Sequence, residues 1–246
     1  HGETIATLSA GDCGLYSDPY KSLMFDVPKI EGLPYRSGPQ DPLWMDASKE
    51  WPGIEKQLNK HAAKLAAIMY EPIMQGAGGM LLYSPDLLVR LRAWADEHDV
   101  YLIADEIAAG MGRCGTMLAS HLAKTADTGY GFAQADFSVL SKGLTSGTLP
   151  LSAVLTSNAI YDIFVADYFD YKAFMHSNTY TGNGLALAVA NATLDIYAEE
   201  RICQHVARMH KLLIPALEGL AEQRKDIRNV RSVGLMAAMD ITSKSG

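Results

Sequence analysis

The sequence has 246 residues, of which 48% are hydrophobic, and a formal net charge of −7 from 21 basic and 28 acidic side chains. Its length and composition predict a globular protein with a sizeable core and argue against intrinsic disorder. A mildly acidic chain without a Lys/Arg block is a poor candidate for binding nucleic acid or an anionic membrane surface. The sequence contains no run of about 18 apolar residues, so it predicts no membrane span.

The first part of the chain alternates helical and strand patterns. Residues 1–12 lack an initiator Met and look like the start of a helix, which suggests an interior portion of a longer protein. Residues 14–48 are rich in Pro, Gly, Tyr and Asp and predict a long irregular segment. A helix over 51–64, a buried strand over 65–70 and a helix over 84–99 follow from their apolar spacing.

The second part predicts further strands that are apolar throughout. In chain order we expect a strand at 100–107, a short helix at 116–126, strands at 136–142 and 151–156, helices at 157–169, 183–200 and 201–224, and a strand at 229–241. Strands of this kind are typical of a largely parallel, twisted sheet with helices on both faces. In such a sheet the chemistry lies outside the carboxyl ends of the strands.

Polar side chains mark three of these strand ends, namely Glu71 with Gln75, Asp105 with Glu106, and Ser141 with Lys142. Lys142 lies between two apolar runs, and we expect Gly143 to let the chain turn closely there. The plain interpretation is a surface lysine. In partly apolar surroundings, however, a lysine can act as an amine nucleophile.

Asp105 is either an ordinary capping carboxylate or one held at a strand end to keep a partner cationic. A lysine that forms a Schiff base, together with an aspartate that pairs a pyridinium nitrogen, is typical of pyridoxal phosphate chemistry. Lys142 and Asp105 are therefore a candidate pair.

Other kinds of site find little support. Cys13, Cys114 and Cys203 are odd in number, far apart and without a Cys-x-x-Cys pair, which disfavours a disulfide framework or structural zinc and favours a reducing, cytoplasmic setting. We expect no metal, because the seven histidines lack ligand spacing except for His205 and His210, which we interpret as solvated residues on a polar helix. No Walker loop, Gly-x-Gly-x-x-Gly dinucleotide motif or Gly-x-Ser-x-Gly elbow is present.

Four phrases carry a family resemblance: "EPIMQGAGGM", "LIADEIAAGMGRCG", "LSKGLTSGTLPLSAVL" and "HSNTYTGNGLA". In this order they resemble the class III (ω-) aminotransferases, which are pyridoxal-phosphate-dependent transferases of fold-type I. The resemblance implies a mostly parallel seven-stranded sheet in a three-layer α/β/α large domain over residues 1–225, without its upstream phosphate loop. Residues 226–246 would begin a smaller C-terminal domain. It also implies a homodimer with shared active sites.

The resemblance assigns roles around the cofactor ring. Lys142 would bind pyridoxal 5'-phosphate covalently, and Asp105 would pair the pyridine nitrogen. Ile107 would pack on the ring, although a plain core isoleucine has the same pattern. Glu71 and Gln75 would lie near the ring, with Gln75 close to its phenolic oxygen. For Glu71, a loop role that satisfies local backbone is an equal alternative.

Further roles concern the phosphate and the substrate. Asn178 and Thr179 match the family's phosphate-binding element, which reaches across the dimer interface, although an ordinary turn before a helix has the same composition. Ser177 would border the substrate. Arg113 would contribute to the substrate region or form a structural ion pair. Glu3 stands where many members have Asp, beside the substrate.

Within the class, the phrases look most like the biotin-pathway branch. Its members transfer the amino group of S-adenosylmethionine to 8-amino-7-oxononanoate and form 7,8-diaminononanoate. Two alternatives stay open. One is another class III enzyme that uses an ω-amino acid or a diamine with pyruvate, and the other is a truncated, non-catalytic remnant of the fold.

Overall fold

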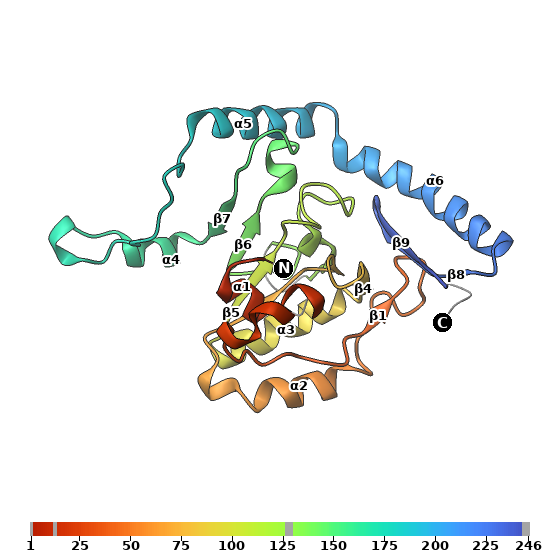
Figure 1. Cartoon of the computed structure of the whole chain (residues 1–246), viewed down its shortest axis with the longest axis horizontal. Coiled ribbons are helices and arrows are strands. Elements are labelled where there is room, and N and C mark those ends of the chain that lie inside the picture. Colours follow the sequence, from red (N-terminus) through yellow and green to blue (C-terminus); the bar gives the residue numbers. More distant parts are fainter. Residues whose placement is uncertain (1, 12–13, 126–129, 243–246) are drawn as a thin grey trace.

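The computed structural model describes residues 2–11, 14–125 and 130–242 (Figure 1). Cys13 and the last residue of the predicted helix 116–126 lie outside these described residues. The helices are α1 (Ile5–Ala10), α2 (Trp51–Asn59), α3 (Asp86–His98), α4 (Asn158–Tyr161), α5 (Gly184–Glu199) and α6 (Ile202–Gln223). The strands are β1 (Tyr35–Arg36), β2 (Ala67–Tyr70), β3 (Met74–Gln75), β4 (Leu81–Tyr83), β5 (Tyr101–Asp105), β6 (Phe137–Leu140), β7 (Ala153–Thr156), β8 (Ile227–Val233) and β9 (Met236–Ile241).

The central sheet has the strand order β2-β5-β6-β7. The pairs β2–β5 and β5–β6 are parallel, whereas β7 runs antiparallel to β6. Parallel neighbours are usually joined by a crossover helix, whereas the link over residues 141–152 contains only the 3₁₀ turn at Lys142–Thr145, and the chain reverses there. The largely parallel sheet is confirmed, with four strands among the described residues rather than the predicted seven.

Two smaller sheets escaped the sequence prediction. Strands β1, β4 and β3 form an antiparallel sheet, in that order. The segment 229–241, predicted as one strand, belongs to a hairpin of β8 and β9. The hairpin turns at Gly234, which has a left-handed φ of 59°, and a Cβ on this glycine would lie 2.4 Å from the carbonyl oxygen of Arg113. Only glycine meets both conditions without strain.

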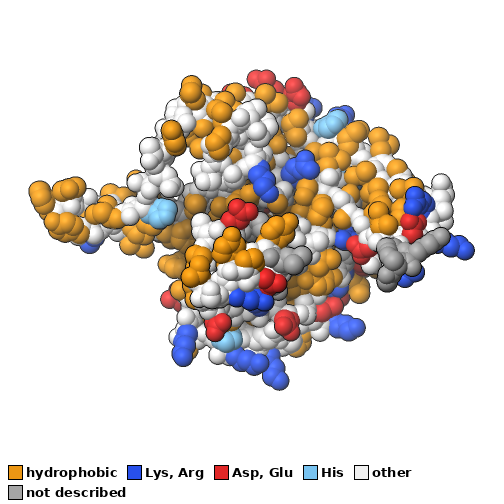
Figure 2. Space-filling model, viewed as in Figure 1, with side chains coloured by type: hydrophobic (Ala, Val, Ile, Leu, Met, Phe, Trp, Pro, Cys, Tyr) orange, Lys and Arg blue, Asp and Glu red, His pale blue; other side chains and the backbone are white. Residues whose placement is uncertain are grey.

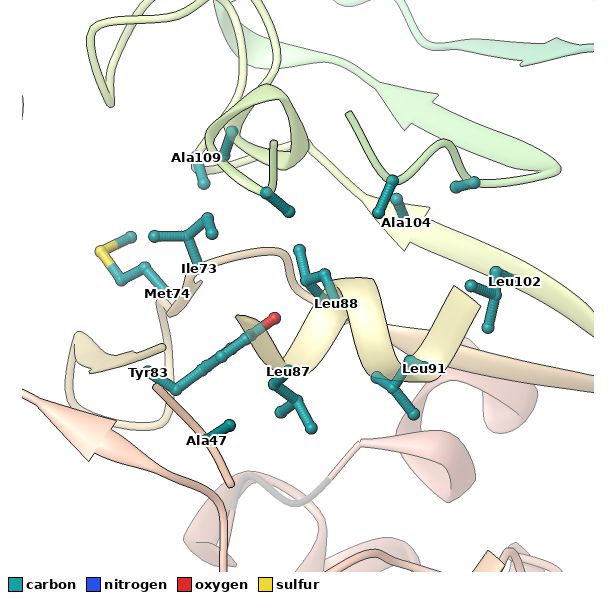
Figure 3. Close-up of a cluster of buried hydrophobic side chains, with 14 of the residues drawn as sticks. Ala47, Ile73, Met74, Tyr83, Leu87, Leu88, Leu91, Leu102, Ala104 and Ala109 are labelled. Atoms are coloured by element: carbon teal, nitrogen blue, oxygen red, sulfur yellow. The ribbon is translucent and has the colours of Figure 1, made fainter. Parts of the chain in front are cut away.

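The main core lies between α3 and the central sheet (Figure 3). Leu87, Leu88 and Leu91 recur at helical spacing on one face of α3 and are buried. Leu102 and Ala104 from β5 join the same cluster of buried side chains. This packing holds β5 firmly, and β5 ends at Asp105.

The predicted helix 157–169 is largely wrong. Only α4 forms there, followed by short 3₁₀ turns at Asp162–Phe164 and Tyr168–Asp170. Residues 157–182, which we call the arm, extend away from the body of the molecule (Figure 1). Their large apolar side chains gather on its surface (Figure 2), and Tyr168 is 83% exposed. A helix is held mainly by burying its apolar face, whereas the large apolar side chains of the arm remain exposed.

Two further helix predictions are only partly right, and two others are confirmed. The predicted helix 51–64 ends at Asn59, with a 3₁₀ turn at Ala62–Lys64, and the predicted helix 116–126 is only the 3₁₀ turn η4 (Ala119–Leu122). Helices α5 and α6 match their predictions and are separated at Arg201, which is left-handed. In the described part of the chain, no helix is both long and apolar enough to span a bilayer.

Candidate active site at the strand ends

The parallel register brings the marked strand ends together. Tyr70 of β2 lies opposite Ala104 of β5, and Asp105 lies opposite Val139 of β6. Glu71 therefore follows β2 at the level of Asp105, and Lys142 follows β6 at the same edge. The backbones of these residues therefore lie at the same, carboxyl edge of the sheet.

Lys142 is exposed, contrary to its predicted apolar setting. It opens the 3₁₀ turn η5 (Lys142–Thr145) and has a left-handed φ of 46°. Leu140 and Leu144 take the buried positions on either side of it, so its side chain faces outward. Within the described residues, no hydrogen bond or ion pair engages its amine, which leaves it open to a ligand.

Gly143 is required by a close contact rather than by its backbone angle. The left-handed residues of this turn are Lys142 and Ser146. A Cβ on Gly143 would lie 2.6 Å from the Cβ of Met111, a separation that real side chains do not reach. Met111 is buried, and its carbonyl oxygen accepts a hydrogen bond from the Tyr197 hydroxyl at 2.7 Å. The turn that carries Lys142 therefore sits directly on the Met111 loop.

Asp105 is half-buried at the end of β5, and its side chain is partly fixed by its own loop. The Asp105 Oδ1 accepts a hydrogen bond from the Ile107 amide at 3.1 Å. Ile107 is also half-buried. The carboxylate of Asp105 and the apolar side chain of Ile107 are therefore neighbours at the end of β5.

Glu71 follows β2, and Gln75 ends β3, just before the glycine loop of residues 76–79. The Glu71 Oε2 accepts the Gly76 amide at 2.6 Å, and the Gln75 Oε1 accepts the Tyr35 hydroxyl at 2.8 Å. A Cβ on Gly76 would lie 3.4 Å from the Cβ of Ala108, next to Ile107. The glycine loop and the loop after Asp105 are therefore neighbours. The local backbone role considered for Glu71 is present.

Two buried polar side chains that support this loop were missed from the sequence. The Tyr83 hydroxyl donates to the Glu71 carbonyl oxygen, and burial raises the pKa of Tyr83, so the hydroxyl stays a donor. Arg231 donates to the carbonyl oxygens of Gly79 and Met80 at 2.6 and 3.1 Å. An arginine inside an apolar strand pattern was the available signal, because a buried guanidinium requires several acceptors.

Ser177, Asn178 and Thr179 do not join the strand ends. All three are exposed on the arm, which extends away from the body (Figure 1). The Asn178 amide donates to the Thr181 Oγ1 at 2.9 Å, and the Thr181 amide donates back to the Asn178 carbonyl. In this chain the segment is a turn before α5, as the simpler interpretation expected.

Arg113 and Glu3 are the two remaining residues predicted near the substrate. The Arg113 Nε donates to the Met236 Sδ at 3.3 Å, and Arg113 borders a hollow of about 200 Å³ beside α5 and α6. Glu3 is exposed and precedes Thr4, the N-cap of α1. No cluster of metal-ligating side chains occurs within the described ranges.

The matches to known proteins cover the whole chain. A family profile described as aminotransferase class-III matches residues 1–246. The chain belongs to the class III aminotransferase family. It is 35% identical over 246 residues to the adenosylmethionine-8-amino-7-oxononanoate aminotransferase of Geobacter sulfurreducens, and 36% identical over 250 residues to that of Helicobacter pylori. Each alignment covers 98% of this chain and 52% of the relative.

Solved structures agree with this family. The adenosylmethionine-8-amino-7-oxononanoate aminotransferase of Methanocaldococcus jannaschii superposes with a TM-score of 0.81 at 30% identity, over 98% of this chain and 51% of that one. A PLP-bound amine transaminase from an uncultivated Pseudomonas species gives 0.82 at 33% identity, over 99% and 54%. The α/β fold of PLP-dependent transaminases is thereby confirmed. The chain spans about half the length of these relatives.

The family and this PLP-bound neighbour indicate pyridoxal phosphate as the cofactor, and the strand-end residues suit it. An amine without a partner among the described residues, a carboxylate one strand away and an apolar side chain beside it provide the groups that such a ring needs. The predicted phosphate ligands, Asn178 and Thr179, lie on the arm instead (Figure 1).

The close contact at Gly143 yields a stability prediction. Replacing Gly143 with Ala should destabilise the fold by about 1–3 kcal/mol, because the new methyl group overlaps Met111. The same change should reduce the yield of cofactor bound at Lys142, because the turn must shift. Urea unfolding and absorbance titration with pyridoxal phosphate measure the two effects.

Gly184→Ala is the matched control, because nothing lies within 4 Å of a Cβ at Gly184. It should leave both measurements near wild type. Equal effects of the two substitutions would contradict the importance of the Met111 contact.

Proposed function

We propose that the protein is a pyridoxal-phosphate-dependent aminotransferase that moves the amino group of S-adenosylmethionine to 8-amino-7-oxononanoate in biotin biosynthesis. The observation that carries the chemistry is the placement of Asp105 and Lys142 at adjacent parallel strand ends. The substrate assignment is supported by relatives of that name at 28–36% identity along nearly the whole chain.

Lys142 has two tasks in this proposal. Its amine would hold the cofactor, and once the amino donor has freed it, the same amine would take the proton from the α-carbon of the donor. The exposed position at the start of η5 supports both tasks, because the amine must leave one partner and reach another. When bound, the cofactor supplies a ring that accepts electrons from that carbon.

Asp105 keeps the ring nitrogen protonated. A carboxylate near this nitrogen favours its charged form. The hydrogen bond from the Ile107 amide to Oδ1 helps to orient the carboxylate for this role. Ile107 packs on the ring and excludes water from one side of it.

Gln75 and Glu71 define the other border of the ring in the proposal. Tyr35 already donates to the Gln75 Oε1, so the Gln75 amide NH₂ is the group that points to the phenolic oxygen. Glu71 holds the loop through the Gly76 amide. Glu3 and Arg113 are assigned to the substrate region, which depends on parts of the site that this edge does not provide.

The arm supports a homodimer with shared sites. Asn178 and Thr179 offer amide and hydroxyl donors suited to a phosphate, but they lie on a segment that leaves its own body (Figure 1). Exposed apolar side chains on such a segment are typical of an interface. We propose that Asn178 and Thr179 bind the cofactor phosphate of a second copy, with Ser177 beside that copy's substrate.

The domain division is also proposed. Residues 1–225 form the cofactor-binding domain, and the hairpin β8–β9, a sheet of its own, begins a second domain at 226.

The cysteines bear on the cellular setting. Cys114 is buried, which raises the pKa of its thiol to about 12, and Cys203 is a free thiol. Free thiols favour a reducing, cytoplasmic setting.

A second candidate function is an amine or ω-amino-acid transaminase. The PLP-bound amine transaminase that matches this chain at a TM-score of 0.82 favours it. Such an enzyme needs the same Lys142 and Asp105, so only the substrate separates the two functions.

Lys142→Ala tests the covalent anchor. The wild-type protein should form a yellow chromophore with pyridoxal phosphate that borohydride fixes to the chain. The variant should lose it, because no other amine is expected at this edge. Lys124→Ala, a change of an exposed lysine elsewhere, should keep it. A reducible chromophore that survives in Lys142→Ala would reassign the anchor, and none in the wild type would favour a non-catalytic remnant.

The amino donor is tested by a half-reaction. S-adenosylmethionine added to the loaded protein should shift its absorbance to that of the pyridoxamine form, without any acceptor present. Alanine and a diamine should leave the spectrum unchanged. Conversion by either of them, and not by S-adenosylmethionine, would establish the second candidate function.

A hybrid dimer tests the shared site. Lys142→Ala and the double variant N178A/T179A should each bind the cofactor poorly when pure. After mixing and re-assembly, about half of the dimers are hybrids with one intact site, so roughly a quarter of wild-type binding should return. No recovery would mean that each chain uses its own arm.

A further inference from the structure

Glu106 is a buried carboxylate that the proposed chemistry does not use. It lies between Asp105 and Ile107 and has no exposed surface. Its two oxygens accept the backbone amides of Ala119 at 2.7 Å and Ser120 at 2.9 Å, both in η4. A carboxylate is this deeply buried only where hydrogen bonds compensate the loss of water.

These bonds close the loop of residues 107–118. At the start of that loop, the Glu106 amide donates to the Val139 carbonyl of β6 at 3.0 Å, and the Gly110 amide donates to the Glu106 carbonyl at 2.8 Å. A Cβ on Gly110 would lie 2.6 Å from that carbonyl oxygen, so a larger residue would displace the turn. The main chain and side chain of Glu106 together fix the loop to β6 and to η4.

The same loop reaches the turn of Lys142. It carries Met111, whose backbone is left-handed and whose side chain packs on Gly143. The Tyr197 hydroxyl fixes the Met111 carbonyl from α5. One end of the loop is thus continuous with Asp105, and its middle supports Lys142.

We propose that Glu106 is a positioning residue that sets the placement of Asp105 relative to Lys142 by closing the loop between them. The inference rests on the proposed function, because it concerns the distance between the two groups that hold the cofactor. Glu106 itself touches neither of them through its carboxylate oxygens in the described contacts.

The bonding pattern calls for an ionised carboxylate. Burial raises the pKa of Glu106, and the charge of Asp105 adds to this, while hydrogen bonds from Ser120 and the Ala119 amide act in the opposite direction. Two amide donors converge on the group, and only a carboxylate presents an acceptor to each of them. A glutamine has one acceptor oxygen and would turn its NH₂ group toward the second donor.

Glu106→Gln therefore breaks one of the two bonds with little change in volume. Asp136→Asn is the matched control at the opposite end of β5, where the Asp136 Oδ2 accepts the Leu102 amide at 2.7 Å and the Arg92 guanidinium at 2.8 Å. Both variants should melt at lower temperature. The control separates a loss of stability from a loss of positioning.

The protein loaded with pyridoxal phosphate is then compared across variants. Glu106→Gln should shift the chromophore maximum and its pH titration and lower kcat by about 10- to 100-fold, with KM nearly unchanged. Asp136→Asn should leave the chromophore and kcat near wild type. In the cofactor-free protein, the Ala119 and Ser120 amides should exchange hydrogen faster in Glu106→Gln only. Glu106→Asp, which keeps a shorter carboxylate, should be intermediate and serves where the glutamine variant fails to fold.

A wild-type chromophore and kcat in Glu106→Gln, or equal changes in Asp136→Asn, would overturn the positioning role and leave the proposed function intact. Absence of the chromophore in the wild-type protein would overturn the proposed function and this inference together.

Discussion

Parallel hydrogen bonding between β2, β5 and β6 is the constraint on which the candidate site depends. Its register sets Tyr70 opposite Ala104 and Asp105 opposite Val139, so the residues that follow each strand emerge at one edge. Neighbouring strands lie about 4.8 Å apart, which brings groups far apart in sequence within reach of one small ligand. The α3 core holds β5 in place, and β5 is the strand that both neighbours share.

Beyond that edge the chain leaves the sheet, and its backbone groups need other partners. Side chains provide several of them. Glu71 accepts the Gly76 amide, and Tyr83 and Tyr197 donate to the Glu71 and Met111 carbonyls. These bonds order the loops around an amine that is itself exposed. Ordered surroundings and an exposed amine are a combination suited to a group that must exchange partners.

The arm, unlike these loops, leaves its apolar side chains exposed. Its apolar side chains remain in water, and its polar candidates for phosphate binding stand away from the strand ends of their own chain (Figures 1 and 2). A folded chain normally buries such side chains, because their transfer from water is its main driving force. A second copy seated on the arm, as proposed above, would remove this exposure.

The sequence alone determined the central strands β2, β5, β6 and β7, the helices α2, α3, α5 and α6, and the polar residues at the strand ends, because apolar periodicity and terminal residues are local properties. Tertiary structure decided what depends on distant partners. It turned 229–241 into part of a hairpin through the close approach of Gly234 to Arg113, and left Lys142 exposed because Leu140 and Leu144 fill the core. It also buried Glu106 next to the half-buried Asp105. Two adjacent carboxylates in a sequence do not reveal this difference in burial, because the amides that hold Glu106 lie 13 and 14 residues away in the chain.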